Sequence, residues 1–447
     1  MNFLFERFAE APDAPAFIDR ERTVSYREVL ASIAGYERFL ETAGMPRKAV
    51  VVVLSDYSPD TFCFLMALAR RACVSVPVTP ASVVERDVVE RLSEATWVAE
   101  FTRGIREPRL SETGRSPENP LLAGFLELGH AGLILFSSGS TGTPKAILHD
   151  LELVAAKFQR RGAPIVSIAF LMLDHFGGIN TILAITSGLG TVVTIGDRSV
   201  AGVCRAVAQH RVEVLPTTPS FLGLLARSDL ADKFDLGSLK RITYGTEVMP
   251  QLTLDRLRQL FPAVQLHQTY GLSELGVLRS QSRADGSLWV RVGGAGFQTK
   301  VVEGILWIKS AYSMVGYLNA PSPFDEEGWF DTQDRVEVDG EWLRILGRVT
   351  DLINVAGQKV YPAEIEELIL ELENVEDVAV YGEPHALLGQ IVVAKVVTRV
   401  PETVESLKQR IRKACAQKLA PFKVPAKVVL AEAGLYSARS KKVRRGG

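Results

Sequence analysis

The sequence predicts an α/β protein with a large N-terminal α/β domain, a small β-rich subdomain within it, and a small C-terminal α+β domain. Short apolar runs that resemble strands alternate with helical patterns through most of the chain. Near Trp289 the pattern changes to short strands separated by turns, and after Gly347 a compact α/β unit begins. We therefore divide the chain into domains at 1–346 and 347–447.

The large domain contains buried-strand patterns separated by helices. A helix is expected over 58–71 because Pro59 suits a first helical turn. Alternation of strands and helices predicts a mostly parallel sheet covered on both faces. The expected strands are 50–54, 75–78, 133–136, 192–195, 214–216 and 242–244.

The remaining elements follow from the same patterns. Pro362 begins an amphipathic helix over 362–371, and a second helix is expected over 404–419. The tail 437–447 is polar and basic. The expected strands are 288–292, 299–302, 305–308, 335–338 and 342–345 in the β-rich unit, and 375–381 and 391–397 in the C-terminal domain.

Composition excludes several classes of function. The formal net charge is −1, so no overall basic field attracts nucleic acid or anionic membranes, and we expect neither partner. The uncharged stretch 176–196 is rich in Gly and Thr and predicts a helix, a turn and a strand rather than a membrane span. No secretion signal is visible, and the cysteines lack metal-ligand spacing, which favours buried thiols in a cytoplasmic protein. These cysteines are Cys63, Cys73, Cys204 and Cys415.

A loop rich in glycine and hydroxyl residues follows the predicted strand 133–136. Glycine allows backbone N–H groups to turn inward around an anion, hydroxyls add donors, and the closing lysine adds a positive charge. The spacing is not that of the Walker motif. Composition alone leaves a polyphosphate site and a flexible turn as equal alternatives. The residues are Ser137, Ser138, Gly139, Ser140, Thr141, Gly142, Thr143 and Lys145.

Further motifs follow this loop in a fixed order. They are His-Phe-Gly-Gly at 175–178, Gly-Thr-Glu at 245–247, Tyr-Gly-Leu-Ser-Glu at 270–274, Asp-Thr-Gln-Asp at 331–334, Gly-Arg-Val-Thr-Asp at 347–351, Asn-Val-Ala-Gly at 354–357, Tyr-Pro-Ala-Glu-Ile-Glu at 361–366 and Ser-Lys-Lys at 440–442. This ordered set resembles the adenylate-forming superfamily: acyl- and aryl-CoA synthetases, luciferases and the adenylation domains of peptide synthetases. The resemblance covers nearly the whole chain.

The resemblance implies that a carboxylate attacks the α-phosphate of ATP, giving an acyl-adenylate and pyrophosphate, and that a thiol, expected to be that of CoA, then accepts the acyl group. Glu274 would bind Mg²⁺, Lys442 would enter the site for adenylation, and His175 would lie beside the acyl site. Beyond the loop, the resemblance assigns ATP or AMP contacts to Gly245, Thr246, Glu247, Tyr270, Gly271, Ser273, Asp334 and Arg348.

The resemblance also places the acyl pocket and the hinge. Amino-acid-activating relatives have an aspartate one residue after the position of His175, where this chain has Phe176. We therefore expect an aryl or fatty acid rather than an α-amino acid. Thr350 and Asp351 would form the hinge about which the small, mobile C-terminal domain turns. The expected pocket residues are Phe176, Tyr244, Leu272 and Gly276.

Three positions depart from the superfamily pattern. Gln333 replaces the central glycine of Thr-Gly-Asp, Lys441 replaces the glycine before the terminal lysine, and Lys359 stands where many relatives have arginine. It stays open whether Lys441 or Lys442 enters the site. The acceptor stays open too: an acyl carrier protein or an amine could replace CoA, and a distant relative activates nitrite to diazotise an aryl amine. A protein that binds nucleotide without turnover is a further alternative.

Overall fold

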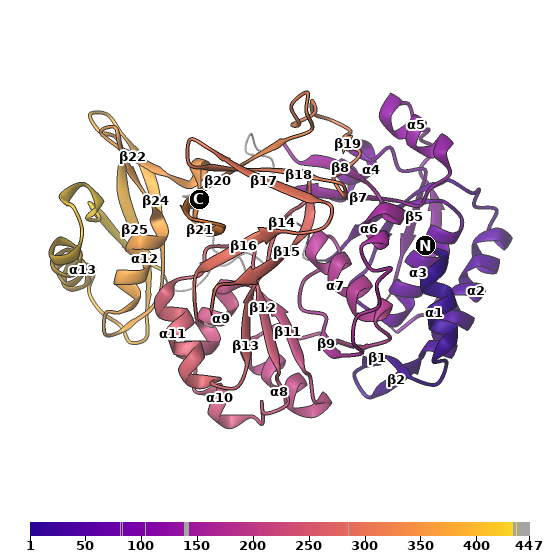
Figure 1. Ribbon diagram of the computed structural model, residues 1–447, viewed down its shortest axis with the longest axis horizontal. Helices are drawn as coiled ribbons and strands as arrows, with labels where there is room; N and C mark the ends of the chain where they lie inside the picture. The colour runs from indigo at the N-terminus through magenta and orange to yellow at the C-terminus, as the bar shows by residue number, and fades with distance from the viewer. Residues whose placement is uncertain are drawn as a thin grey trace.

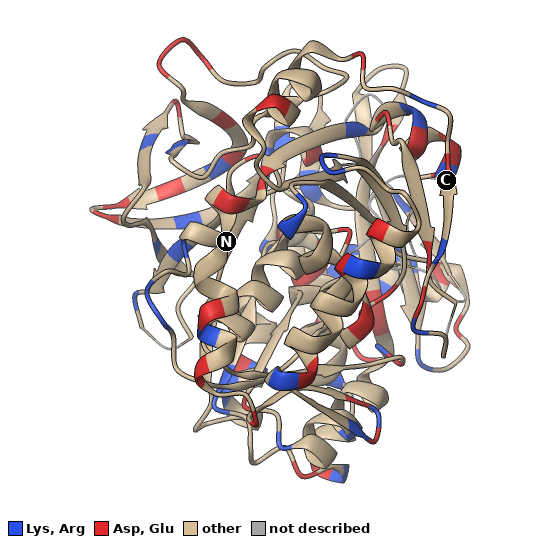
Figure 2. Cartoon of the chain, turned by 90° about the vertical axis from the view of Figure 1, so that its right-hand side faces the viewer, with Lys and Arg blue, Asp and Glu red and all other residues tan. Residues whose placement is uncertain are grey.

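The computed structural model describes residues 1–80, 82, 84–102, 104–137, 143–284, 286–431 and 435. It has a large N-terminal part and a smaller C-terminal part, drawn in yellow-orange tones on the left of Figure 1. Lys and Arg alternate with Asp and Glu over the face seen in Figure 2, as the near-zero net charge suggests.

The large part holds one mainly parallel sheet and one mixed sheet, in which three strand pairs are parallel and three antiparallel, whereas the β/α alternation led us to expect a single, mostly parallel sheet. Alternation identifies strands but not their neighbours, so this division was not visible in the sequence. The first sheet has the order β13 (Gln265–Gln268), β12 (Arg241–Tyr244), β11 (Val214–Thr217), β9 (Val166–Ile168), β10 (Thr191–Thr194), β1 (Pro15–Asp19) and β2 (Arg22–Ser25). The second has the order β19 (Gly316–Tyr317), β8 (Lys145–Asp150), β7 (Gly132–Ser137), β4 (Val74–Val78), β3 (Val50–Leu54), β5 (Trp97–Glu100) and β6 (Arg109–Glu112).

Helices fill the space between and around these sheets. One hydrophobic core joins α1 (Asn2–Glu10), α2 (Tyr26–Thr42), α3 (Pro59–Arg70) and α7 (Phe176–Ser187) to strands of both sheets. Helix α3 begins where predicted, because the Ser58 side chain accepts a hydrogen bond from the backbone N–H of Thr61 and Pro59 occupies the first turn. The other helices of this part are α4 (Arg86–Leu92), α5 (Pro120–Leu128), α6 (Leu151–Ala156), α8 (Val200–His210), α9 (Pro219–Arg227), α10 (Leu230–Lys233) and α11 (Gln251–Leu260).

An antiparallel sheet forms the predicted β-rich unit. Its order is β14 (Tyr270–Leu272), β15 (Gly276–Ser282), β16 (Trp289–Gly293), β21 (Trp342–Arg348), β20 (Phe330–Asp339), β18 (Ile305–Ser310) and β17 (Phe297–Val302). Gly347 and Arg348 still pair with Arg335 and Asp334 of β20. We therefore place the domain boundary after Arg348 rather than before Gly347.

The C-terminal part has its own hydrophobic core. Helix η1 (Val349–Asp351) leads into a sheet packed against α12 (Pro362–Leu370) and α13 (Val404–Lys418), close to the predicted helices. The sheet has the order β23 (Gln358–Val360), β22 (Ile353–Val355), β25 (Gly389–Thr398) and β24 (Val375–His385), with β26 (Lys427–Leu430) beside β25 and the short helix η2 (Pro421–Lys423) before it.

Two sequence expectations can be checked directly. The uncharged stretch 176–196 folds as α7, a turn and β10, and within the described ranges no helix is both long and apolar enough to cross a membrane. All four cysteines are buried and none forms a disulfide. In the same ranges, no group of three or more His, Cys, Asp or Glu side chains could hold a metal ion.

Candidate functional site

The segment 245–247, which we expected to contact adenine, leaves the end of β12 in a constrained conformation. A Cβ atom on Gly245 would lie 2.5 Å from Thr269 Oγ1, so only glycine fits beside that residue. Thr246 has a φ of 73°, which a β-branched residue rarely adopts. Glu247 Oε2 accepts a hydrogen bond from the backbone N–H of Ser220, at 3.2 Å, at the start of α9. The structure thus fixes this segment against two neighbouring elements.

Three strands bring Tyr270, Asp334 and Arg348 together. The Tyr270 hydroxyl donates to Asp334 Oδ2 at 2.5 Å, and Arg348 Nε lies 3.4 Å from Asp334 Oδ1. Asp334 is only 7% exposed, and burial raises the pKa of its carboxyl, while Arg348 and the Tyr270 hydroxyl act in the opposite direction. Arg348 therefore approaches Asp334 from the end of β21, just before the predicted hinge residues. Gly271 lies beside this group on β14, where a Cβ atom would lie 2.8 Å from the carbonyl oxygen of Gly276.

Gln333 keeps the backbone conformation that the glycine of the superfamily motif would favour. Its φ is 59°, in the left-handed region. The Gln333 side-chain amide donates to Asp331 Oδ2 at 2.5 Å, and its backbone N–H donates to Asp331 Oδ1 at 2.9 Å. The added polar group is therefore bound by its own neighbour.

A tyrosine that the motifs did not include joins Glu274 to Lys145. The Tyr317 hydroxyl donates to Glu274 Oε1 at 2.8 Å, and Lys145 Nζ lies 4.7 Å from the centre of the Tyr317 ring. Strand β19 brings Tyr317 opposite Ile147 of β8. No pattern around Tyr317 indicated this pairing, because it depends on strands far apart in the sequence.

The ends of the predicted phosphate loop are described, although its centre is not. Ser137 pairs with Lys145 across β7 and β8. Asn319, also absent from the motifs, accepts from the backbone N–H of Ala146 at 2.9 Å and donates to the Pro144 carbonyl at 2.8 Å. Thr143 is exposed. Ser138, Gly139, Ser140, Thr141 and Gly142, like Lys441 and Lys442, lie outside the described residues.

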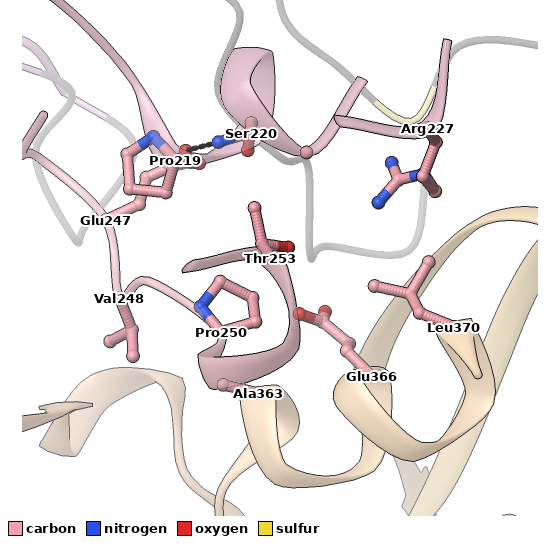
Figure 3. Close-up of a pocket in the computed structure, with 11 residues that line it drawn as sticks. Pro219, Ser220, Arg227, Glu247, Val248, Pro250, Thr253, Ala363, Glu366 and Leu370 are labelled. Carbon is pink, nitrogen blue, oxygen red and sulfur yellow. Dashed lines mark hydrogen bonds between the residues drawn. The ribbon is translucent and has the colours of Figure 1, made fainter. Parts of the chain in front are cut away.

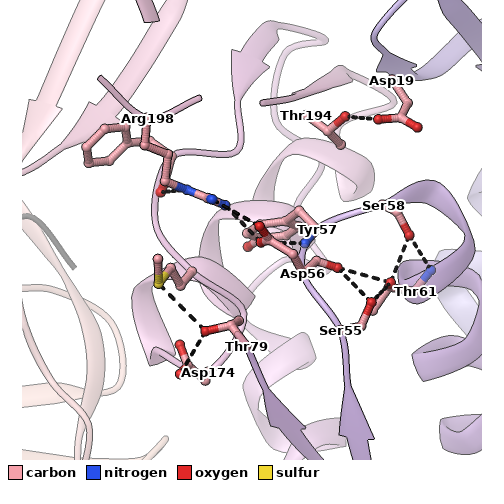
Figure 4. Close-up of polar contacts among 12 residues, drawn as sticks. Asp19, Ser55, Asp56, Tyr57, Ser58, Thr61, Thr79, Asp174, Thr194 and Arg198 are labelled. Atoms are coloured by element: carbon pink, nitrogen blue, oxygen red, sulfur yellow. Dashed lines mark hydrogen bonds and ion pairs between the residues drawn. The ribbon is translucent and has the colours of Figure 1, made fainter. Parts of the chain in front are cut away.

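His175 caps α7, and this local role accounts for its position. Its Nδ1 accepts from the backbone N–H of Gly177 at 3.0 Å. A Cβ atom on Gly178 would lie 2.0 Å from the Met172 carbonyl oxygen, which explains the glycine. Figure 4 shows that Asp174, the preceding residue, accepts from the Thr79 hydroxyl at 3.1 Å. The start of α7 is therefore fixed against a loop that follows β4.

In the same region, an ion pair links the two large sheets. Arg198 forms a bidentate pair with Asp56, with nitrogen–oxygen distances of 2.9 and 3.0 Å (Figure 4). Its Nε also donates to the Phe170 carbonyl at 3.2 Å. Because a bidentate guanidinium–carboxylate pair fixes direction as well as distance, it sets the position of the chain that leads to His175.

The residues expected to form the acyl pocket come from four elements. Phe176, 2% exposed, begins α7, and Tyr244, 1% exposed, ends β12. Leu272 pairs with Gly276 between β14 and β15. Gly276 has a φ of 81°, and a Cβ atom there would lie 3.3 Å from the Phe176 ring. Phe176 and Gly276 are therefore neighbours. Ser273 lies in the turn between Leu272 and Gly276.

The two domains meet next to the 245–247 segment. A small pocket there is lined by Glu247 and Pro250 of the large domain and by Ala363 and Glu366 of α12 (Figure 3). Glu367 Oε1 accepts from the backbone N–H of Leu252 at 2.9 Å. The predicted hinge residues Thr350 and Asp351 lie in η1, directly after β21.

Comparison with known proteins gives two family matches. The sequence model of the AMP-binding enzyme family matches residues 4–119 and 126–318, and that of the AMP-binding enzyme C-terminal domain matches 364–442. Acyl-CoA synthetase 7 of Caenorhabditis elegans is 31% identical over 323 residues, which cover 64% of this chain and 59% of that protein. 4-Coumarate:CoA ligase 1 of Petunia hybrida is 24% identical over 456 residues, covering 89% of this chain and 84% of the ligase.

Solved structures share the fold. The anthranilate CoA ligase AuaEII in complex with anthranoyl-AMP has a TM-score of 0.82 at 17% identity, covering 99% of this chain and 95% of the ligase. The amide bond synthetase McbA from Marinactinospora thermotolerans has a TM-score of 0.77 at 19% identity, covering 99% and 97%. Because the family models match both parts of the chain, this protein belongs to the AMP-binding enzyme family, the adenylate-forming superfamily.

Proposed function

We propose that this enzyme activates an aryl or fatty carboxylic acid with ATP and transfers the acyl group to the thiol of CoA. The observation that carries the choice of acid is Phe176, a buried aromatic residue at the position where amino-acid-activating relatives have an aspartate. Its ring lies against Gly276, so this position offers an apolar surface in place of the carboxylate that would pair with an α-amine. The acyl-CoA and 4-coumarate:CoA ligases among the relatives support CoA as acceptor.

The adenylation step needs positioning and charge compensation more than covalent catalysis. An oxygen of the acid forms a bond to the α-phosphorus of ATP, the bond from that phosphorus to the bridging oxygen breaks, and pyrophosphate leaves with the bond electrons. Lys145 lies at the end of the loop that would hold the departing phosphates. Asp334 offers two acceptor oxygens for ribose hydroxyls, and Arg348 lies beside it.

The residues around Glu274 suit Mg²⁺. Mg²⁺ is usually held in proteins by one or two carboxylates together with substrate phosphates, so a single carboxylate near the phosphate loop is sufficient. Bound there, Mg²⁺ would neutralise charge on the phosphate oxygens. Tyr317 fixes the direction of the Glu274 carboxylate by donating to one of its oxygens.

A lysine from the tail would complete the adenylation site. We propose Lys442 for this role, with rotation at Thr350 and Asp351 bringing it in and later withdrawing it for the thiol step. Substituting Lys442→Ala should abolish pyrophosphate release, while Lys441→Ala should leave it nearly unchanged. The reverse result would assign the role to Lys441.

The decisive experiment measures pyrophosphate release from ATP and Mg²⁺ with a panel of fatty, benzoic and cinnamic acids, with and without CoA, followed by mass spectrometry of the products. We expect release with at least one acid and a new acyl-CoA when CoA is present. Glu274→Gln serves as the inactive control. An acyl-adenylate that reacts with amines but not with CoA would contradict the proposed acceptor and favour amide formation. Failure of every acid would contradict acid activation, and nitrite with an aryl amine would then be the next substrates to test.

A further inference from the structure

Lys157 is a half-buried cation whose hydrogen-bond partners are uncharged, next to the proposed acyl pocket. It follows α6, and its Nζ donates to Asn180 Oδ1 of α7 at 3.1 Å and to the Val277 carbonyl of β15 at 2.6 Å. Aromatic rings surround the same atom: the centres of Phe158, Phe297 and Tyr312 lie 5.8, 6.0 and 5.8 Å from it. Neither the motifs nor the helical pattern of the sequence marked this lysine.

The charge of Lys157 is not compensated by an acid in the part of the chain that the structure describes. Its two hydrogen-bond acceptors are neutral, and the charged group that acts on it is another cation, Arg279. Burial, with a contribution from Arg279, lowers the pKa of Lys157 to about 8, so the side chain is still mostly protonated at neutral pH. A half-buried charge of this kind gains stability when an anion is placed beside it.

The ammonium group of Lys157 lies close to Gly276, a residue expected to line the acyl pocket. A Cβ atom on Gly276 would lie 3.9 Å from Lys157 Nζ and 3.3 Å from the Phe176 ring. Gly276 has no side chain, so the lysine and the aromatic ring approach the same position from two sides. An ammonium carries three donors, of which two are bound to Asn180 and Val277, and the third remains for a ligand.

We propose that Lys157 is a specificity-determining residue that binds a second anionic group of the acid substrate, distinct from the carboxylate that is activated. The inference rests on the proposed function, since it narrows the substrate class to acids that carry a further carboxylate or similar oxyanion. The aromatic rings near Nζ lower the local polarity, which strengthens the attraction between the two charges. The competing explanation is structural: Lys157 would only tie α7 to β15.

The test compares acids that share a skeleton and differ in one distal group: terephthalate with 4-methylbenzoate, and adipate with hexanoate. Pyrophosphate release gives kcat/KM for each acid. The ratio of diacid to monoacid is measured within one preparation and is therefore independent of the fraction of folded protein. We expect the wild-type enzyme to prefer the diacid of at least one pair. Lys157→Met should lower that ratio about tenfold or more, as expected when one partner of a desolvated charge pair is removed.

Two control variants separate charge from structure. Lys157→Arg keeps a cation and should retain a preference for the diacid, while Lys309→Met removes an exposed lysine and should leave the ratio unchanged. An equal ratio in Lys157→Met and wild type, or a wild-type preference for the monoacid in every pair, would overturn the inference and leave the proposed function intact. No pyrophosphate from any acid with the wild-type enzyme would instead overturn the proposed function, and this inference with it.

Discussion

Gln333 shows how a residue can depart from a motif without changing the backbone that the motif specifies. Its φ of 59° is one that glycine adopts freely and that other L-residues adopt at a cost of about 1–2 kcal/mol. Two hydrogen bonds to Asp331 offset that cost. The sequence identified the position as unusual, but only the structure shows that the geometry is kept and that the amide is bound by a neighbour.

Gln333→Gly should therefore be nearly neutral for folding. Removing the left-handed strain stabilises the fold. The greater freedom of glycine in the unfolded chain and the loss of the side-chain hydrogen bond to Asp331 destabilise it. These effects oppose one another, so the free energy of unfolding should change by less than about 1 kcal/mol. Urea unfolding measures this change in the free energy of unfolding. Asn374→Gly is a matched comparison at φ 63°, where the Asn374 side chain bonds both backbone groups of Val400, so this variant should lose more stability. A larger loss at Gln333 than at Asn374 would contradict the explanation.

Lys157 predicts a pH dependence of stability whose sign follows from its lowered pKa. Between pH 8 and 10.5 the unfolded chain keeps the proton on this lysine while the folded protein releases it. Since the unfolded state then binds more protons, stability increases as pH rises through this window. Relative to Lys157→Met, the wild-type free energy of unfolding should rise by about 1 kcal/mol per pH unit. Parallel denaturant titrations from pH 7.5 to 10.5 measure the difference, and a constant difference would contradict a desolvated ammonium.

At the scale of elements, β19 places a residue that sequence motifs did not identify. It pairs with β8 and brings Tyr317 against Glu274. Tyr317→Phe should allow the Glu274 carboxylate to rotate, while the aromatic ring beside Lys145 is kept. A hydrogen bond to a charged group contributes about 1.5–3 kcal/mol, so kcat/KM for ATP should fall by roughly tenfold, with a higher Mg²⁺ requirement.

Steady-state pyrophosphate release at varied Mg²⁺ checks this prediction. Tyr381→Phe, on β24 of the C-terminal domain, removes a hydroxyl remote from the site and should leave these constants unchanged. If Tyr317→Phe also left them unchanged, Tyr317 would not position Glu274.

A buried ion pair links the two domains. The sequence pattern of either domain alone could not predict it. Arg227 of α9 lies 3.8 Å from Asp377 of β24, and their side chains are 8% and 5% exposed. Removing Arg227 takes away a buried cationic partner of Asp377, and the loss of one member of a buried ion pair costs up to about 3–5 kcal/mol. Arg227→Met should therefore weaken this domain orientation and make the segment 349–351 more sensitive to proteolysis.

An exposed ion pair in the same domain provides the control. Arg211 and Asp235 are 69% and 67% exposed, so Arg211→Met should leave cleavage at 349–351 unchanged. The double variant Arg227→Met with Asp377→Asn should be less sensitive than the single variant, because the buried negative charge is removed together with the cation. Equal cleavage in Arg227→Met and wild type would mean that this pair does not hold the domains.

The sequence could predict individual helices and strands, but not which distant segments lie beside one another. Val50–Leu54 and Ser58–Arg71 were predicted correctly because apolar runs, caps and proline act locally. The ordered motifs predicted the family. Three features were not predictable, because each depends on contacts between distant segments: the division into two sheets, the bonds of Asn319 to Pro144 and Ala146, and the position of Lys157 beside Gly276. Asn319 and Pro144, for example, are 175 residues apart in the chain.

At the scale of the whole molecule, the domains have separate cores and should open independently. Cys63, Cys73 and Cys204 lie in cores of the large domain, and Cys415 lies in the core of the C-terminal domain. Burial raises the pKa of all four thiols, those of Cys204 and Cys415 to about 11, so each reacts with a thiol reagent only after local or global opening. The four cysteines are therefore natural reporters of where the protein opens.

ATP with Mg²⁺ should slow labelling of the three cysteines of the large domain more than that of Cys415. Most of the proposed nucleotide contacts, including Asp334 and Arg348, lie before the boundary at 348, and a ligand that binds only the folded form stabilises it by about 2.7 kcal/mol at a hundred times its dissociation constant. This corresponds to roughly a hundredfold slower labelling where opening destroys the site. Mass spectrometry of peptides after timed alkylation gives the four rates separately, with unreactive free phosphate as the ligand control. Equal protection of Cys415 and the other three would mean that the domains open as one cooperative unit, and the separate hydrophobic cores would then not be separate units of stability.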